Sequence, residues 1–447
     1  MVDVQAQRLE RAYRVLSGDD SDERSCEAIP ESACTSVPRN YVYNVANGAS
    51  TKLAEQIAGP NLVLPWLLAA LGTPAAIVGF LMPVKQVGSL APQLLFSGRI
   101  RRLRQRKWAW TVAGSVQACM LLLIAAAALI LPPLSAGVTI LVLFAVFSVF
   151  SGLGSVAFQD VTAKTIPKGR RGRLLANRAA IGGGLTLVAG LALQYGPGES
   201  GGTEVFILMV VAAAALWAFA ALLFAAMEEE HGATGGGRSP WRELEAGLAL
   251  CRDVPGYRGY LATRALLLSV ELAMPFYALH GREVLGGEVA ALGLFIVTVG
   301  LASVLSSPFW GYFSDRSSRT VLALSGLLGA AAGVVALLIA AAPEPLQSSW
   351  LYTSVFILIG IAEAGARLGR KTYLVDAAPA DERPLYVAFS NTGIGLLAIA
   401  GGSFGVIAQV FGINTLVVLL IALGIAGAGA AWWMPEAERM LDGAETT

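Results

Sequence analysis

The chain is poor in charged residues, histidines and cysteines, and each shortage argues against a class of function. Only 14% of its 447 residues are charged, whereas about 25% is usual for a soluble domain. Two histidines, His231 and His280, and four cysteines without a C-x-x-C pair argue against a zinc site. The sequence also has no P-loop and no nucleophile beside a base at catalytic spacing. We therefore expect no metal, no cofactor and no enzymatic activity.

What the chain has in quantity is apolar sequence. Its composition is 55% hydrophobic, and 32 basic residues nearly balance 31 acidic ones. This balance gives no reason to expect nucleic-acid binding. The composition predicts a polytopic protein whose main partner is the lipid bilayer.

A window of about 20 apolar residues, the length that crosses the hydrocarbon core, fits the sequence twelve times. The predicted spans are 46–71, 73–97, 108–131, 136–164, 173–195, 204–227, 258–280, 287–311, 319–342, 349–375, 384–411 and 413–434. The fold class is therefore an all-α polytopic membrane protein. We divide the chain into an N-terminal tail (1–43), a first half (44–227), a linker with an amphipathic helix (228–257), a second half (258–435) and a C-terminal tail (436–447).

Basic residues set the predicted orientation. They crowd the loops after spans two and four, whereas Arg282 is the one basic residue in the alternate loops. By the positive-inside rule both termini are cytoplasmic, in a bacterial-type inner membrane. Cys26 and Cys34 of the tail then lie in a reducing compartment, so we expect no disulfide.

Two related turns lie about half a chain apart. Gly311-Tyr-Phe-Ser-Asp-Arg-Ser-Ser-Arg319 separates spans eight and nine, and Gly98-Arg-Ile-Arg-Arg-Leu-Arg-Gln-Arg106 separates spans two and three. A second pair of similar segments follows spans four and ten. They carry Asp160 and Arg171 in the first half, and Asp376 and Arg383 in the second. This recurrence predicts two related halves, with a binding site between them near the bilayer midplane.

The G-x-x-x-D-R-x-x-R turn resembles the signature loop of the major facilitator superfamily of secondary transporters. The resemblance implies that Asp315 latches the cytoplasmic face, next to Arg316, and that Arg319 shares its ion pair, with Asp376 as a candidate partner. The first copy departs from the pattern because Arg102 stands where the acid belongs. Its partner is expected to be Asp160 or a lipid headgroup.

Four charged residues fall near the middle of predicted spans, where charge is costly and usually functional. They are Lys85, Glu271, Glu363 and Arg367. Glu271 has no basic residue one turn away, so we expect it to carry a proton as access alternates. Glu363 and Arg367 have the i,i+4 spacing of a local pair. The alternative is that all four charges form fixed buried pairs.

Three uncharged residues complete the candidate pathway. Gln86 and Gln117 are hydrogen-bonding candidates, and Tyr277 is a candidate cavity wall. For an aromatic residue in a membrane helix, packing is the alternative.

The resemblance implies a monomeric secondary transporter that moves a small-molecule substrate by alternating access. We expect coupling to protons and export of an organic solute, because the four midplane charges cancel. Two alternatives remain open: a solute importer, and a non-transporting sensor or scaffold that acts through the tail with Cys26 and Cys34.

Overall fold

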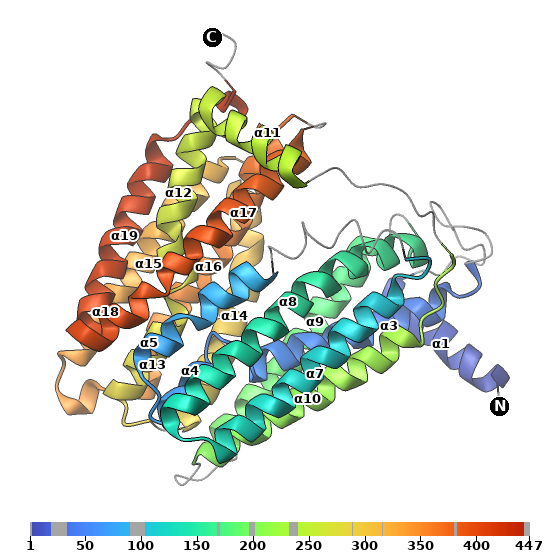
Figure 1. The fold of residues 1–447 in the computed structure, drawn as a ribbon, viewed down its shortest axis with the longest axis horizontal. Helices are drawn as coiled ribbons and strands as arrows, with labels where there is room; N and C mark the ends of the chain where they lie inside the picture. The colour runs from blue at the N-terminus through green and yellow to red at the C-terminus, as the bar shows by residue number, and fades with distance from the viewer. Residues whose placement is uncertain are drawn as a thin grey trace.

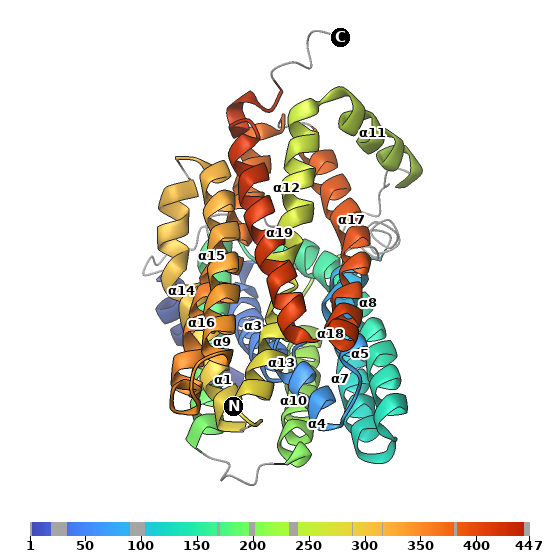
Figure 2. The ribbon, with the colours of Figure 1, turned by 90° about the vertical axis from the view of Figure 1, so that its left-hand side faces the viewer.

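The computed structural model describes residues 2–18, 34–89, 103–167, 170–195, 202–231, 240–287, 289–314, 316–379 and 382–441. Within these ranges the regular structure is helical and contains no strand. Figures 1 and 2 show the helices gathered into two bundles, one for each half of the chain.

The first bundle follows the helix α1 (Val2–Ser17) along the chain. Its helices are α3 (Val37–Ile57), α4 (Val63–Ala70), α5 (Ala75–Gly79), α7 (Lys107–Ile130), α8 (Pro133–Thr165), α9 (Arg171–Tyr195) and α10 (Thr203–Ala225).

The second bundle follows the linker helix α11 (Pro240–Asp253). Its helices are α12 (Pro255–Glu271), α13 (Met274–Val284), α14 (Val289–Ser314), α15 (Ser318–Ala340), α16 (Ser349–Ala377), α17 (Arg383–Gly401), α18 (Ser403–Phe411) and α19 (Ile413–Trp433), followed by the short 3-10 helix η2 (Ala437–Arg439).

The predicted all-α membrane architecture is confirmed. In the described part of the chain, ten helices are long and apolar enough to cross a bilayer. The other two predicted spans are the broken pair α3 and α4, and the apolar helix Ala75–Ser89, whose continuation lies outside the described residues.

The first span begins at Val37, nine residues before its predicted start. Its early turns carry buried asparagines at positions 40, 44 and 47, which lowered the hydropathy on which the prediction depended. Two of these side chains donate inside the bundle: Asn40 donates to the Glu228 carbonyl at 2.8 Å, and Asn47 donates to the Ala220 carbonyl at 3.0 Å. A polar face turned toward other helices is therefore compatible with a membrane helix.

Spans one and seven are both broken at corresponding places. The chain leaves α3 at Ile57, passes Gly59-Pro60 and resumes as α4, whereas α12 ends at Glu271 and α13 resumes with Pro275 in its first turn. Proline cannot donate the backbone hydrogen bond that would continue the preceding helix. Both breaks lie inside the helix bundles. At each break the backbone leaves the helix, so polar groups face the interior at a point where a continuous helix would expose only side chains.

Glycines allow the two bundles to approach closely along α5 and α18, and along α9 and α14. A Cβ on Gly79 would lie 2.6 Å from the Cα of Gly405, and a Cβ on Gly293 would lie 2.6 Å from the carbonyl oxygen of Gly190. These contacts hold the bundles together at one end. In Figure 1 the bundles meet near α4, α5, α13 and α18, and diverge toward the end that carries α1, α11 and η2, which we call the tail side.

Helix α1 is docked on the first bundle at the tail side. Tyr13 is buried, and its ring meets that of Tyr41 edge-to-face at 5.3 Å. The last carbonyls of α1 are bound by α9 and the turn before it: Asn177 donates to Leu16, and Arg173 and Arg170 donate to Ser17. Cations at a helix C-terminus offset its partial negative charge.

The tail also corrects one expectation. Cys34 is disulfide-bonded, whereas the sequence argument depended on compartment alone and predicted no disulfide. Cys119 and Cys251 are free, and Cys26 lies outside the described residues.

The close approach of α5 and α18 predicts that Gly405→Ala destabilises the fold. The added methyl would lie 2.6 Å from the Ala75 carbonyl oxygen and 2.8 Å from the Gly79 Cα. Because backbone atoms cannot rotate away, the helices must separate, at a cost of about 1–3 kcal/mol. Gly393→Ala, whose methyl would meet nothing within 4 Å, is the matched control. We expect Gly405→Ala alone to lower the Tm of the purified protein, and an equal Tm for both variants would contradict this packing.

Candidate functional site

A polar cavity of about 250 Å³ lies between the two bundles, at the breaks of spans one and seven. The first bundle contributes side chains from α3, from the break and from the helical stretch 81–89: Lys52, Glu55, Gln56, Asn61, Lys85, Gln86 and Ser89. The second contributes Glu271 at the end of α12 and three residues of α16: Glu363, Arg367 and Arg370. The structure thus brings Lys85, Gln86, Glu271, Glu363 and Arg367 into one site.

Glu271 is the centre of this cavity's hydrogen bonding. Its Oε1 lies 2.6 Å from Nη1 of Arg370, and Gln86 Nε2 donates to its Oε2 at 3.2 Å. Both charged side chains are mostly buried, with 12% of Glu271 and 23% of Arg370 exposed. The carboxylate therefore joins α12 to α16 by an ion pair, and joins the second bundle to the first by the Gln86 hydrogen bond.

Glu271 has no basic residue one turn away along its helix, as the sequence showed, but it has a basic partner on another helix, Arg370, which the sequence reasoning missed. The two lie 99 positions apart, so a search one turn along the helix could not pair them. A signal was present: Arg370 is seven residues after Glu363, which places both on one face of α16.

Glu363 and Arg367 do lie beside each other, as their spacing predicted. Their closest charged atoms are 3.9 Å apart, and 45% of the Arg367 side chain is exposed. Such a contact is looser than the Glu271–Arg370 pair and contributes little. Arg367 is therefore free to change partner at small cost.

Two lysines of the first bundle differ from these paired residues. Among the described residues, neither Lys52 nor Lys85 has a carboxylate oxygen within 4 Å, and Glu55 has no basic nitrogen within that distance. The lining carries four basic side chains, Lys52, Lys85, Arg367 and Arg370, against three acidic ones, Glu55, Glu271 and Glu363. The expectation of a cavity without net charge is therefore wrong by one positive charge.

Gln117 and Tyr277 lie away from this cavity. Gln117 is buried on α7 within the first bundle. Tyr277 is buried on α13, where its hydroxyl faces the Gly329 carbonyl of α15 at 3.5 Å. Helix periodicity did not distinguish the cavity side from the packed side of these spans, and for Tyr277 the packing alternative describes the structure.

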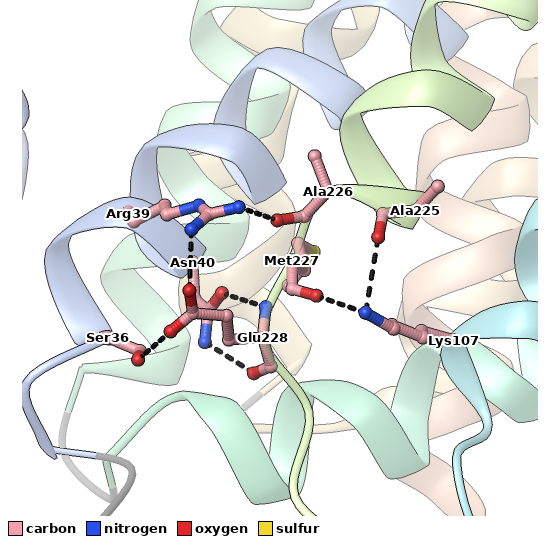
Figure 3. Close-up of polar contacts among 8 residues, drawn as sticks. All are labelled: Ser36, Arg39, Asn40, Lys107, Ala225, Ala226, Met227 and Glu228. Carbon is pink, nitrogen blue, oxygen red and sulfur yellow. Dashed lines mark hydrogen bonds and ion pairs between the residues drawn. The ribbon is translucent and has the colours of Figure 1, made fainter. Parts of the chain in front are cut away.

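At the tail side of the first bundle, the end of α10 is held by α3 and α7 (Figure 3). Arg39 donates to the Ala226 carbonyl at 2.6 Å and pairs with Glu228. Lys107 Nζ donates to the carbonyls of Ala225 and Met227 at 3.2 and 2.7 Å. These carbonyls have no partner within α10, so the cations both satisfy them and offset the helix dipole.

The second bundle repeats this arrangement with the signature turn. Arg319 donates to the carbonyls of Trp432 and Met434 and pairs with Glu436 at 2.9 Å, and Ser317 also donates to Glu436. The expected partner Asp376 instead lies exposed on α16. The resemblance had suggested Asp376, at the end of span ten, whereas the acid comes from the segment after the last span.

The remaining residues of the repeated turns lie nearby. Arg106 pairs with Asp160 at 3.0 Å, so Arg106 takes the partner that was proposed for Arg102. Arg171 donates to the carbonyls of Ile166 and Ala163 at the end of α8.

In the second copy, Arg316 lies over the Tyr312 ring at 4.6 Å, and a methyl group at Gly311 would meet no atom of the described neighbouring residues within 4 Å. Gly98, Arg102 and Asp315 lie outside the described residues, as does the side chain of Arg383.

Two comparisons by sequence bear on the family. Residues 259–445 match the model of the Major Facilitator Superfamily. The chain is 26% identical over 410 residues to the uncharacterized protein Rv2209 of Mycobacterium tuberculosis and to the uncharacterized protein Mb2232 of Mycobacterium bovis. The alignment covers 90% of this chain and 78% of each relative.

Solved structures extend the likeness of fold to both halves. A mutant of the nucleoside transporter NupG superposes with a TM-score of 0.71 at 14% identity, covering 88% of this chain and 99% of that one. The inward-open xylose transporter XylE of E. coli gives 0.65 at 16% identity, covering 90% and 98%. The C-terminal half of the chain thus matches the Major Facilitator Superfamily by sequence, and the chain as a whole shares the fold of these solved transporters.

Proposed function

We propose that this protein is a secondary active transporter that moves a small organic solute across the membrane by alternating access, coupled to protons through Glu271. The observation that carries the proposal is the contact of Glu271 with both bundles, inside a cavity at the breaks of spans one and seven. A group in this position senses both the solute and the relative position of the bundles.

The geometry supplies a coupling step. While Glu271 is ionised, Arg370 neutralises it and Gln86 ties it to the first bundle. Protonation of the carboxylate removes its charge, which weakens the pair with Arg370 and frees the guanidinium for the solute. Because an ionised acid would be left unpaired if Arg370 moved alone, proton uptake and the movement of Arg370 occur together.

The direction of transport is a separate part of the proposal. Efflux was predicted from a cavity without net charge, whereas the lining carries one extra positive charge, so the proposal covers both export and uptake. One structural neighbour is described as a D-xylose-proton symporter. In proteoliposomes, solute entry that makes the external medium more alkaline indicates symport, and entry that acidifies it indicates antiport.

We predict that Glu271→Gln abolishes proton-driven accumulation of the solute and leaves solute exchange intact. The amide keeps the size and hydrogen bonding of the carboxylate but cannot take up a proton. Accumulation should fall at least about tenfold, the scale expected when an essential proton carrier is lost. Counterflow in the same proteoliposomes measures exchange. Glu363→Gln is the matched control, and unchanged accumulation in Glu271→Gln would contradict the coupling role.

We also predict that Arg370→Gln lowers the Tm more than Arg367→Gln does. The first variant leaves Glu271 as an uncompensated acid in a mostly buried place, whereas Arg367 is half exposed and loosely paired. The double variant Glu271→Gln/Arg370→Gln should recover much of the lost Tm, because it removes both charges. If the two losses were additive, the ion pair would not be the source of the stability.

A further inference from the structure

Two lysines of the cavity, which have no acidic partner among the described residues, indicate the charge of the solute. Four of the seven charged side chains in the lining belong to the pairs Glu271–Arg370 and Glu363–Arg367. Of the remainder, Lys52 and Lys85 outnumber Glu55. We propose that the transported solute is a small hydroxylated organic anion, a carboxylate or phosphate ester, whose charged group binds Lys85 with the support of Lys52. This inference rests on the transporter function proposed above.

Lys85 is the lysine whose position matters most. It lies in the helical stretch 81–89 of the second span, next to Gln86, and therefore one residue from the Glu271 network. An ammonium group within a membrane span is costly unless a partner or water compensates it. A neutral solute that displaced water from the cavity would leave this charge uncompensated, whereas an anion supplies the missing partner.

The other charged groups of the cavity do not provide that partner. Glu271 already accepts hydrogen bonds from Arg370 and Gln86, and Glu363 lies next to Arg367 on the opposite bundle. Glu55 lies on α3 and can offset one lysine only. One positive charge therefore remains for the solute.

The uncharged lining indicates the rest of the molecule. Asn61 lies at the break of the first span, and its Oδ1 atom is buried without a hydrogen-bond donor among the described residues. Gln56 also lines the cavity. A hydroxyl group donates to such acceptors, and 250 Å³ accommodates a molecule of about the size of a six-carbon polyol, below the range typical of drug-sized ligands.

Three probes share a linear six-carbon hydroxylated skeleton and differ in charge: gluconate is an anion, sorbitol is neutral and glucamine is a cation. Ligand-dependent thermal unfolding of the purified full chain measures their apparent affinities. We expect gluconate to bind at least about tenfold more tightly than either other probe, the preference that a close charge pair provides. Equal affinities, a preference for glucamine, or no response to gluconate would overturn the proposal.

Variants then assign the preference to a residue. Lys85→Gln should abolish the preference for gluconate, whereas Lys85→Arg, which keeps the charge, should retain it. Lys371→Gln removes the same charge from an exposed position on α16 outside the cavity lining and should change nothing. Gluconate preference that survives in Lys85→Gln overturns the assignment.

Flux distinguishes this inference from the transporter proposal. Movement of sorbitol or glucamine into proteoliposomes without movement of gluconate would overturn the anion proposal and leave the transporter function standing. If neither these probes nor a broad panel of neutral and charged solutes crossed the membrane, both proposals would fail.

Discussion

A charged group inside a membrane bundle is costly unless a partner compensates it, and one buried ion pair of this protein meets that cost. Glu271 and Arg370 meet it together, between the end of α12 and the face of α16, and Gln86 brings in the other bundle. The break after Glu271 is essential to this contact because it leaves the carboxylate at a helix end, directed into a polar cavity. The proposed proton coupling and the stability of the bundle therefore involve the same contact.

Pseudo-symmetry is visible in the polar contacts as well as in the helices. Lys107 begins α7 and binds the last carbonyls of α10, and Arg319, near the start of α15, binds those of α19. In each half an acid from the segment after the last span joins the same contact: Glu229 accepts from the Lys107 backbone, and Glu436 pairs with Arg319. The two halves thus close their tail sides by the same chemistry despite different residues in the signature turns.

The sequence was sufficient for features that depend on local pattern. Hydropathy located the spans, the repeated turns predicted two halves, and the midplane charges Lys85, Glu271, Glu363 and Arg367 identified most of the charged cavity lining. What it could not provide was pairing across long separations. Arg370 with Glu271 and Arg319 with Glu436 join residues 99 and 117 positions apart, and only the packing of whole helices decides which charges meet. The sequence could not show that Gln117 and Tyr277 are buried in packing for the same reason: contacts with neighbouring helices decide which face of a helix points into the cavity.

The docking of α1 has a consequence for the order in which the chain is assembled. This helix leaves the ribosome before the groups that bind its last carbonyls, because Arg170, Arg173 and Asn177 are made about 150 residues later. Until the fifth span is in place, the surface that binds the apolar side of α1, including Tyr13, is incomplete. The nascent tail therefore stays undocked until then, in solution or bound to a chaperone or a lipid surface. Its docking marks the point at which the first five spans have come together, so truncated chains that end before α9 should leave the tail open to protease.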